Sequence, residues 1–271
     1  MILIYIGDNI ITGDYRNWAK KKTFLKYKNE MLNCEALEDL FWRNYKQEYD
    51  WMKTLNFIIN RDEIKKSITN STDTRERAYK IKNFIKELPT YAVLFKRNVN
   101  GIESEICPRC NKYEENWNHI WICENNKTSI REAIEDALIN YEERMERRGE
   151  NDTVKVINKI AKKFIGFLQE ESNILLNKTK EWELIRGVLN ENLIKLSNGK
   201  EEKEIIWELW RESYKETKKI WVERCNEVEQ LEKDKGIMKR DKRKFNNGKK
   251  IETKEKTKEN IEITKKNKTR K

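Results

Sequence analysis

The sequence predicts a mainly α-helical protein, an irregular helical bundle with a short N-terminal strand and a disordered, basic C-terminal tail. Only nine glycines and two prolines interrupt 271 residues, so few positions break a helix. Apolar residues recur at spacings of three and four along most of the chain, which is the period of an amphipathic helix. Because 39% of the residues are charged and the mean hydropathy is -0.98, a deep core over the whole length is not expected.

The N-terminal part begins with an apolar run from Met1 to Ile6, which predicts a buried strand and is too short to cross a bilayer. Aromatic and aliphatic residues at helical spacing over 14–59 then predict two helices and a third around Trp51 to Ile58. A polar break precedes a helix capped by Asp73 or Thr74, with an apolar face of Ala78, Ile81, Ile85 and Leu88. Weak alternation over 91–99 predicts a short hairpin or an irregular arm.

The C-terminal half has the clearest helical pattern. Ser129 and Glu132 form a capping box before an apolar stripe of Ile130, Ala133, Ile134, Ala137, Leu138, Tyr141 and Met145. Further helices are expected over about 156–168 and 179–196, and the run 201–232, without Gly or Pro, predicts a long helix. That helix either packs along the bundle or offers a coiled-coil surface. The expected segments are 1–66, 67–127, 128–236 and a disordered tail over 237–271.

Metal-ligand residue types cluster at one place in the chain. Cys107-Pro108-Arg109-Cys110 is followed by His119 and Cys123, a spacing of Cys-x2-Cys-x8-His-x3-Cys. Three thiolates and one imidazole are a donor set that tetrahedral Zn²⁺ takes in closed structural sites. The two-residue gap lets both sulfurs of the first pair face one point, and a helix would place His119 and Cys123 on one face. We therefore predict a CCHC zinc-binding segment; the alternative is three ordinary buried thiols and a surface histidine.

Cysteine usage also bears on location. Five cysteines are an odd number, and the N-terminus does not resemble a secretory signal, so a disulfide framework is disfavoured and an intracellular location is expected.

Net charge is concentrated at the C-terminus. The chain carries +11, but the segment from Lys239 onward holds fifteen Lys and Arg against five Asp and Glu, leaving 43 basic and 42 acidic residues before it. The cluster from Lys239 to Lys244 is of the kind that serves as a nuclear address or a nucleic-acid arm, although a solubilising tail fits equally well. Candidate nucleic-acid contacts are Lys96, Arg97, Arg109, Lys112, Lys239, Arg240, Lys242, Arg243 and Lys244 for phosphates, with Trp117 and Trp121 for base stacking.

Several of these residues together resemble a known family. Leu88-Pro89-Thr90, a basic arm, Cys-Pro-Arg-Cys, Glu114-Glu115, His119-Ile120 and Cys123 look like the zinc-binding segment near the C-terminus of non-LTR retrotransposon reverse transcriptases. Flanking similarity lies in Trp51 with Lys53-Thr54, and in Trp221-x2-Arg224-Cys225 with Glu232 and Gly236-Ile237. The resemblance implies that Cys107, Cys110, His119 and Cys123 bind zinc and that the chain engages nucleic acid during reverse transcription. It is specific only over about 88–123, and the chain looks like a C-terminal remnant of such an element.

The catalytic motifs of such polyproteins are not present in this sequence. Tyr5-Ile6-Gly7-Asp8 has one carboxylate where a polymerase strand has two adjacent ones to hold two metal ions. We therefore expect no enzymatic activity, and nucleic acid as the partner rather than a membrane or a small-molecule substrate. The alternative is a structural or protein-interaction domain in which zinc only stabilises the fold. Exposed Trp117 beside basic residues would favour nucleic-acid binding, whereas burial of Trp117 and Trp121 would favour the interaction domain.

Overall fold

A computed structural model of the chain describes residues 5–6, 9–10, 14–41, 48–60 and 70–243. Their elements are two antiparallel two-residue strands, β1 (Tyr5–Ile6) and β2 (Asn9–Ile10), a 3₁₀ turn η1 (Glu35–Leu37), and the helices α1 (Tyr15–Leu32), α2 (Glu38–Phe41), α3 (Trp51–Ile58), α4 (Ser71–Phe84), α5 (Tyr91–Lys96), α6 (His119–Ile122), α7 (Ile130–Arg147), α8 (Asn151–Gln169), α9 (Glu181–Arg186), α10 (Glu191–Ile194), α11 (Lys200–Asp234) and α12 (Lys239–Lys242). The described part of the chain is mainly α-helical, as the sequence predicts. None of its helices is both long and apolar enough to span a membrane.

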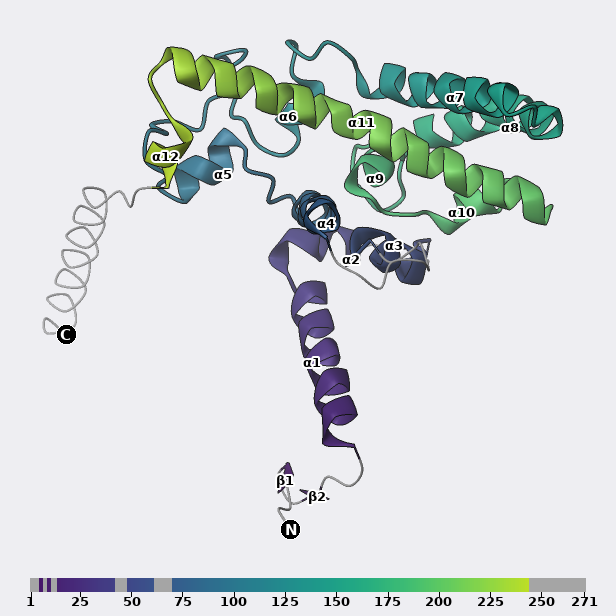
Figure 1. The fold of residues 1–271 in the computed structure, drawn as a ribbon, viewed down its shortest axis with the longest axis horizontal. Helices are drawn as coiled ribbons and strands as arrows, with labels where there is room; N and C mark the ends of the chain where they lie inside the picture. The colour runs from purple at the N-terminus through teal and green to yellow at the C-terminus, as the bar shows by residue number, and fades with distance from the viewer. Residues whose placement is uncertain (1–4, 7–8, 11–13, 42–47, 61–69, 244–271) are drawn as a thin grey trace, which may run out of the picture.

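The long helix α11 runs along the length of the helical body (Figure 1). Its 35 residues correspond to about 52 Å, and α7 lies along it while α6, α8, α9 and α10 also contact it. The run has no Gly or Pro, begins with Glu201 and Glu202, and ends before Gly236, whose φ of 74° is left-handed. The predicted long helix is confirmed, and it packs along the bundle rather than standing free.

Helix α7 follows its sequence signals closely. The Ser129 hydroxyl accepts from the Glu132 N–H at 3.2 Å, and the Glu132 carboxylate accepts from the Ser129 N–H at 2.7 Å. All seven residues of the predicted apolar stripe are buried. A short turn at Arg148 to Glu150 leads into α8, which packs against α7 and completes the C-terminal half of the core.

Four local predictions are wrong. Residues 91–96 form α5 rather than a hairpin or arm, because Thr90 caps a helix whose Tyr91 side packs against Ile102 and Val228. Helix α4 is capped by Asn70, so Asp73 lies inside its first turn with a buried carboxylate that accepts from the Asn60 side chain at 2.7 Å. Ala78, placed on its apolar face by the sequence, is exposed. Gly187, at φ 81°, divides the expected 179–196 helix into α9 and α10.

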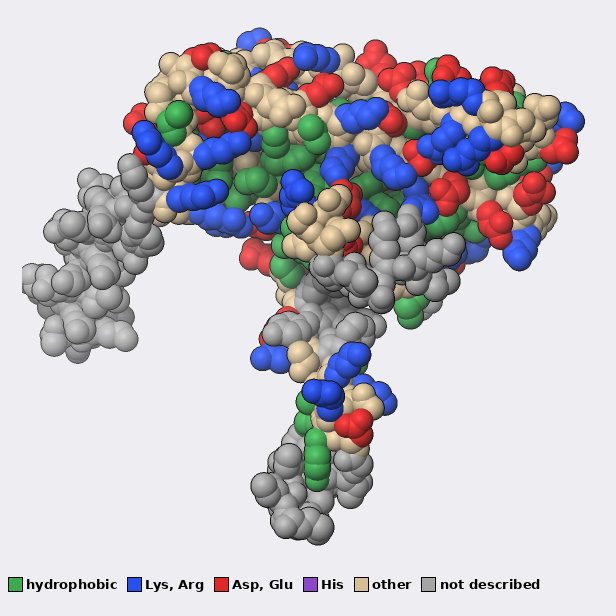
Figure 2. Space-filling view, viewed as in Figure 1, with side chains coloured by type: hydrophobic (Ala, Val, Ile, Leu, Met, Phe, Trp, Pro, Cys, Tyr) green, Lys and Arg blue, Asp and Glu red, His purple; other side chains and the backbone are tan. Residues whose placement is uncertain are grey.

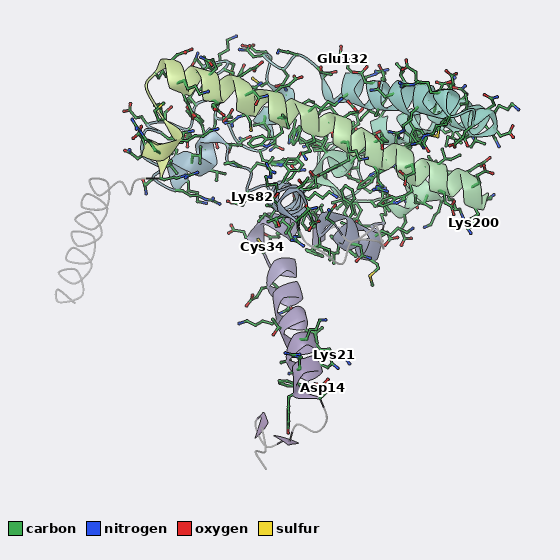
Figure 3. All side chains as sticks on the ribbon, viewed as in Figure 1. Asp14, Lys21, Cys34, Lys82, Glu132 and Lys200 are labelled. Atoms are coloured by element: carbon green, nitrogen blue, oxygen red, sulfur yellow. The ribbon has the colours of Figure 1, made fainter. Side chains whose placement is uncertain are left out.

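The N-terminal part extends from the body. Helix α1 projects away from the main core, with Asp14 and Lys21 near its far end (Figures 1 and 3). The buried core contains residues from Leu37 and Leu40 through Trp221, so the first three predicted segments all contribute to it.

Part of the basic cluster folds onto the body as α12, so the disorder predicted over 237–271 is wrong for 237–243. Lys239 forms an ion pair with Glu229 at 2.7 Å, and Lys242 pairs with Glu232. The predicted disorder of the remaining tail, including Lys244, concerns residues that lie outside the described ranges, as does Asp8.

Candidate metal centre

The first ligand pair lies in a tight turn. The Cys107 N–H donates to the Tyr113 carbonyl and the Asn111 N–H to the Cys107 carbonyl, both at 2.8 Å. Asn111 takes the left-handed φ of 55° that closes the turn, a conformation that asparagine tolerates. An isolated bridge between Ile106 and Glu114 joins the two arms of the turn.

Backbone N–H groups surround the sulfurs of this turn. Burial raises the pKa of Cys107 to about 12, although the N–H groups of Cys110 and Arg109 act against it. Burial also acts to raise the pKa of Cys110, but the N–H groups of Lys112 and Tyr113 outweigh it and lower that pKa. A turn whose N–H groups point at both sulfurs is suited to thiolates, and a bound metal would deprotonate such thiols outright.

The second ligand pair comes from the single turn of α6. The Asn116 side chain accepts from the His119 N–H at 3.0 Å, and Cys123 follows directly after the helix. Burial lowers the pKa of His119, so the imidazole is neutral at pH 7, the form that binds a metal. Burial raises the pKa of Cys123, although the Asn125 N–H opposes this.

The four ligand atoms converge. All lie within 4.8 Å of one another and all four residues are buried. The Cys107 and Cys123 sulfurs are 4.0 Å apart, and the Cys110 sulfur is 3.4 Å from His119 Nε2. A tetrahedral Zn²⁺ with metal–sulfur bonds of about 2.3 Å separates two sulfurs by about 3.8 Å. The described residues therefore contain a buried Cys3His cluster that could hold a metal ion such as zinc.

A buried arginine tests whether a metal fits here. The side chain of Arg109 is only 3% exposed, and its Nε and Nη2 atoms have no hydrogen-bond partner among the residues that the structure describes. Its Nη1 donates to Asn126 at 2.9 Å and lies 3.4 Å from Glu227. Zn²⁺ with three thiolates and a neutral imidazole carries a net charge of about -1. Because a buried cation needs a nearby anion, such a centre fits the position of Arg109.

A second buried arginine connects the metal segment to α11. Glu115 is fully buried, and its carboxylate accepts from Arg224 Nε at 2.9 Å, from Arg224 Nη2 and from the Tyr91 N–H at 2.8 Å. The Glu115 Oε1 atom is also 3.7 Å from the Cys107 sulfur. The sequence singled out Glu115 and Arg224 only as part of the resemblance and assigned them no role. Their meeting was not predictable, because 109 residues separate them.

The two tryptophans predicted to stack on bases are in the core, which corrects that expectation. Trp117 is 6% and Trp121 is 2% exposed. The Trp117 Nε1 donates to the buried Asn83 side chain at 2.9 Å, and the two indole rings meet edge-on with centroids 5.9 Å apart. Neither ring therefore presents a free face for a nucleobase.

The residues predicted to contact phosphates lie on several elements and differ in their exposure. Arg109 is buried, whereas Lys112 is exposed and pairs with Glu124 at 2.6 Å. Lys96 is exposed on α5, and Arg97 just after it pairs with Glu87. Arg240 and Arg243 lie in and after α12 and are exposed.

Comparison with protein-family models, curated proteins and solved structures finds no match to this chain.

Proposed function

We propose that this chain is a zinc-stabilised helical scaffold that acts as a protein-interaction domain. The metal would be held by Cys107, Cys110, His119 and Cys123, and its role would be structural, since four protein ligands leave no open coordination position. The observation that carries the proposal is the buried Glu115–Arg224 pair, which ties the metal segment to α11.

Two further contacts support this role. Glu232, about two helical turns beyond Arg224, accepts from the Tyr91 hydroxyl at 3.2 Å and pairs with Lys242. Glu227 lies on the same half of α11 and faces Arg109. Zinc would thus order the turn that holds the C-terminal half of α11 in place, while α7 and α8 support the N-terminal half through apolar packing and the ion pairs Arg144–Glu212 and Lys159–Glu202.

The test is metal content together with local exchange. Purified, reduced protein should contain one equivalent of zinc, and Cys110→Ala should lose it, whereas Cys34→Ala, outside the cluster, should keep it. Removing zinc with a chelator should speed backbone hydrogen exchange over 105–126 and 224–234 and leave α7 protected. A zinc-free protein, or equal exchange changes in α7 and in 224–234, would refute the scaffold role.

Nucleic-acid binding is the second candidate, and the charge distribution favours it. The chain carries +11, and α1 contains six basic residues against one acidic residue. Figure 2 shows basic side chains on this projecting helix. With both tryptophans buried, this candidate relies on phosphate contacts rather than on base stacking.

Salt dependence tests this second candidate. Each neutralised phosphate of B-DNA contributes a slope of about -0.9 to the plot of log affinity against log salt, so five contacts give about -4.5. Deleting 239–271 should flatten that slope and leave zinc bound. A deletion that changes neither affinity nor slope would exclude the tail as the phosphate-binding segment and favour the interaction domain.

A further inference from the structure

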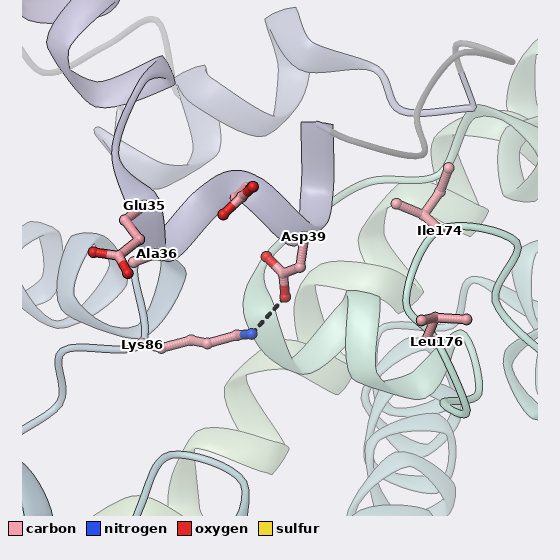
Figure 4. Close-up of a pocket in the computed structure, with 7 residues that line it drawn as sticks. Glu35, Ala36, Asp39, Lys86, Ile174 and Leu176 are labelled. Carbon is pink, nitrogen blue, oxygen red and sulfur yellow. Dashed lines mark hydrogen bonds and ion pairs between the residues drawn. The ribbon is translucent and has the colours of Figure 1, made fainter.

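A groove lies between the N-terminal helices and the loop that precedes α9. Its wider cavity, of about 490 Å³, is lined by Glu35, Glu38 and Asp39 on one side and by Ile174 and Leu176 on the other, with Lys86 between them (Figure 4). A smaller cavity of about 180 Å³ shares Asp39, Lys86 and Leu176 with it. The two cavities are therefore neighbouring parts of the groove, and none of the four metal ligands lines either of them.

The smaller cavity carries an excess of positive charge. It is lined by Lys86, Lys178 and Arg186 and by a single carboxylate, Asp39. Asp39 already accepts two bonds from Arg186 Nη1, at 2.8 and 2.7 Å, and one from Lys86. Within the described ranges, Lys178 has no acidic partner; its Nζ lies 3.6 Å from the centroid of the Trp182 ring. The lining of the smaller cavity therefore carries an excess of two positive charges, three cations against one carboxylate.

Lys86 takes a conformation that lysine rarely adopts. Its φ is 57°, at the position after the C-terminus of α4 where glycine or asparagine is usual. A non-glycine residue held there is strained, and such residues are often found where the side chain has a function. Burial and the charge of Arg186 lower the pKa of Lys86, and burial and the charge of Lys86 lower the pKa of Lys178. The three cations thus repel one another, and a bound anion would relieve this repulsion.

We propose that this groove binds a phosphate monoester whose organic part carries hydroxyl groups, such as a nucleotide or a sugar phosphate. A phosphate monoester has about 1.5 to 2 negative charges at pH 7, which matches the excess of two positive charges. Its phosphate would sit between Lys86 and Lys178, with the exposed Asn118 side chain at the edge. In the wider cavity, the carboxylates of Glu35 and Glu38 can accept hydrogen bonds from hydroxyl groups. This inference does not depend on the scaffold role.

The deciding variant is Lys178→Met. Methionine keeps an unbranched apolar chain over the Trp182 ring and removes only the charged end, so the fold should be retained. Lys195→Met is the matched control, because it removes the same charge from an exposed lysine paired with Glu191 outside the groove. Calorimetric titration of the zinc-loaded protein would use adenosine 5′-monophosphate and glucose 6-phosphate, with adenosine and glucose as phosphate-free comparators.

The expected result is saturable binding of at least one phosphate monoester and no binding of its phosphate-free comparator. Lys178→Met should weaken that binding by about tenfold or more, since charge-assisted hydrogen bonds to phosphate are strong, and Lys195→Met should leave it unchanged. The stronger of the two ligands would identify the organic part as nucleoside or sugar. If neither phosphate monoester binds, or if both variants weaken binding equally, the proposal is wrong.

Discussion

Replacing Arg224 with methionine tests the link between the metal segment and α11. The variant leaves the Glu115 carboxylate fully buried with the Tyr91 N–H as its close donor and the Cys107 sulfur 3.7 Å away, because two charge-assisted hydrogen bonds from Arg224 are lost. Each such bond contributes about 1.5–3 kcal/mol, and removing one partner of a buried ion pair typically costs about 3–5 kcal/mol. We therefore expect the free energy of unfolding to fall by about 3–5 kcal/mol.

The assay is thermal unfolding of the zinc-loaded protein followed by circular dichroism. For a chain of this size, 1 kcal/mol corresponds to about 2–4 °C, so Tm should fall by about 6–20 °C. Glu115→Gln alone should destabilise comparably because it leaves the Arg224 guanidinium buried beside a neutral amide. The double variant should be no worse than either single one, since neither charge then remains. A loss below about 1 kcal/mol for Arg224→Met, or strictly additive effects, would refute the reasoning.

Three further predictions follow from single residues. Burial acts to raise the pKa of Asp39, but Arg186 and Lys86 together outweigh it and hold the pKa below its usual value, so the stabilising contribution of Asp39 is present above about pH 4 and lost below. Asp39→Asn should therefore lower Tm at pH 7, and its difference from the wild type should shrink as the pH falls below about 4; a constant difference would contradict this. Gly187→Ala should cost at least about 1 kcal/mol more than Gly149→Ala in denaturant melts, because both φ values are positive but only at Gly187 does the new Cβ meet a side chain at 3.0 Å. The chain should neither polymerise nor cleave nucleic acid; metal-dependent activity abolished by Asp8→Asn would overturn that expectation.

Patterns within the segment itself were sufficient to predict the long helices α7 and α11. The Ser129–Glu132 box and the seven-residue stripe define α7 within the segment itself, and the absence of Gly and Pro over 201–232 does the same for α11. The short helix α5 was missed because its apolar residues fit either a strand or a single helical turn. Its packing against Val228 decides between them, and that contact depends on the fold of α11.

The metal ligands could be predicted from local patterns, whereas the contacts of the residues around them depend on distant parts of the chain. Residue type and spacing identify Cys107, Cys110, His119 and Cys123, since a metal site constrains both. Nothing local indicates that Trp117 bonds to Asn83, 34 residues earlier, so its burial could not be predicted. An aromatic residue beside a zinc ligand fits a stacking surface and a core position equally well until its tertiary partner is known.

Arg109 shows why a basic residue in a metal turn is ambiguous from sequence alone. An arginine between two cysteines of a turn can be exposed, and an exposed guanidinium can bind a phosphate. Here the side chain lies inward, where Glu227 supplies a partly exposed carboxylate at 3.4 Å and the thiolates of a loaded site would supply the remaining negative charge. The guanidinium would then stabilise a loaded metal centre and α11 together, because it pairs with Glu227 of the helix and its charge favours the Cys123 thiolate. Because the Arg109 side chain is buried, it is not available to a polyanion. Any polyanion must be bound by the lysines and arginines that remain exposed.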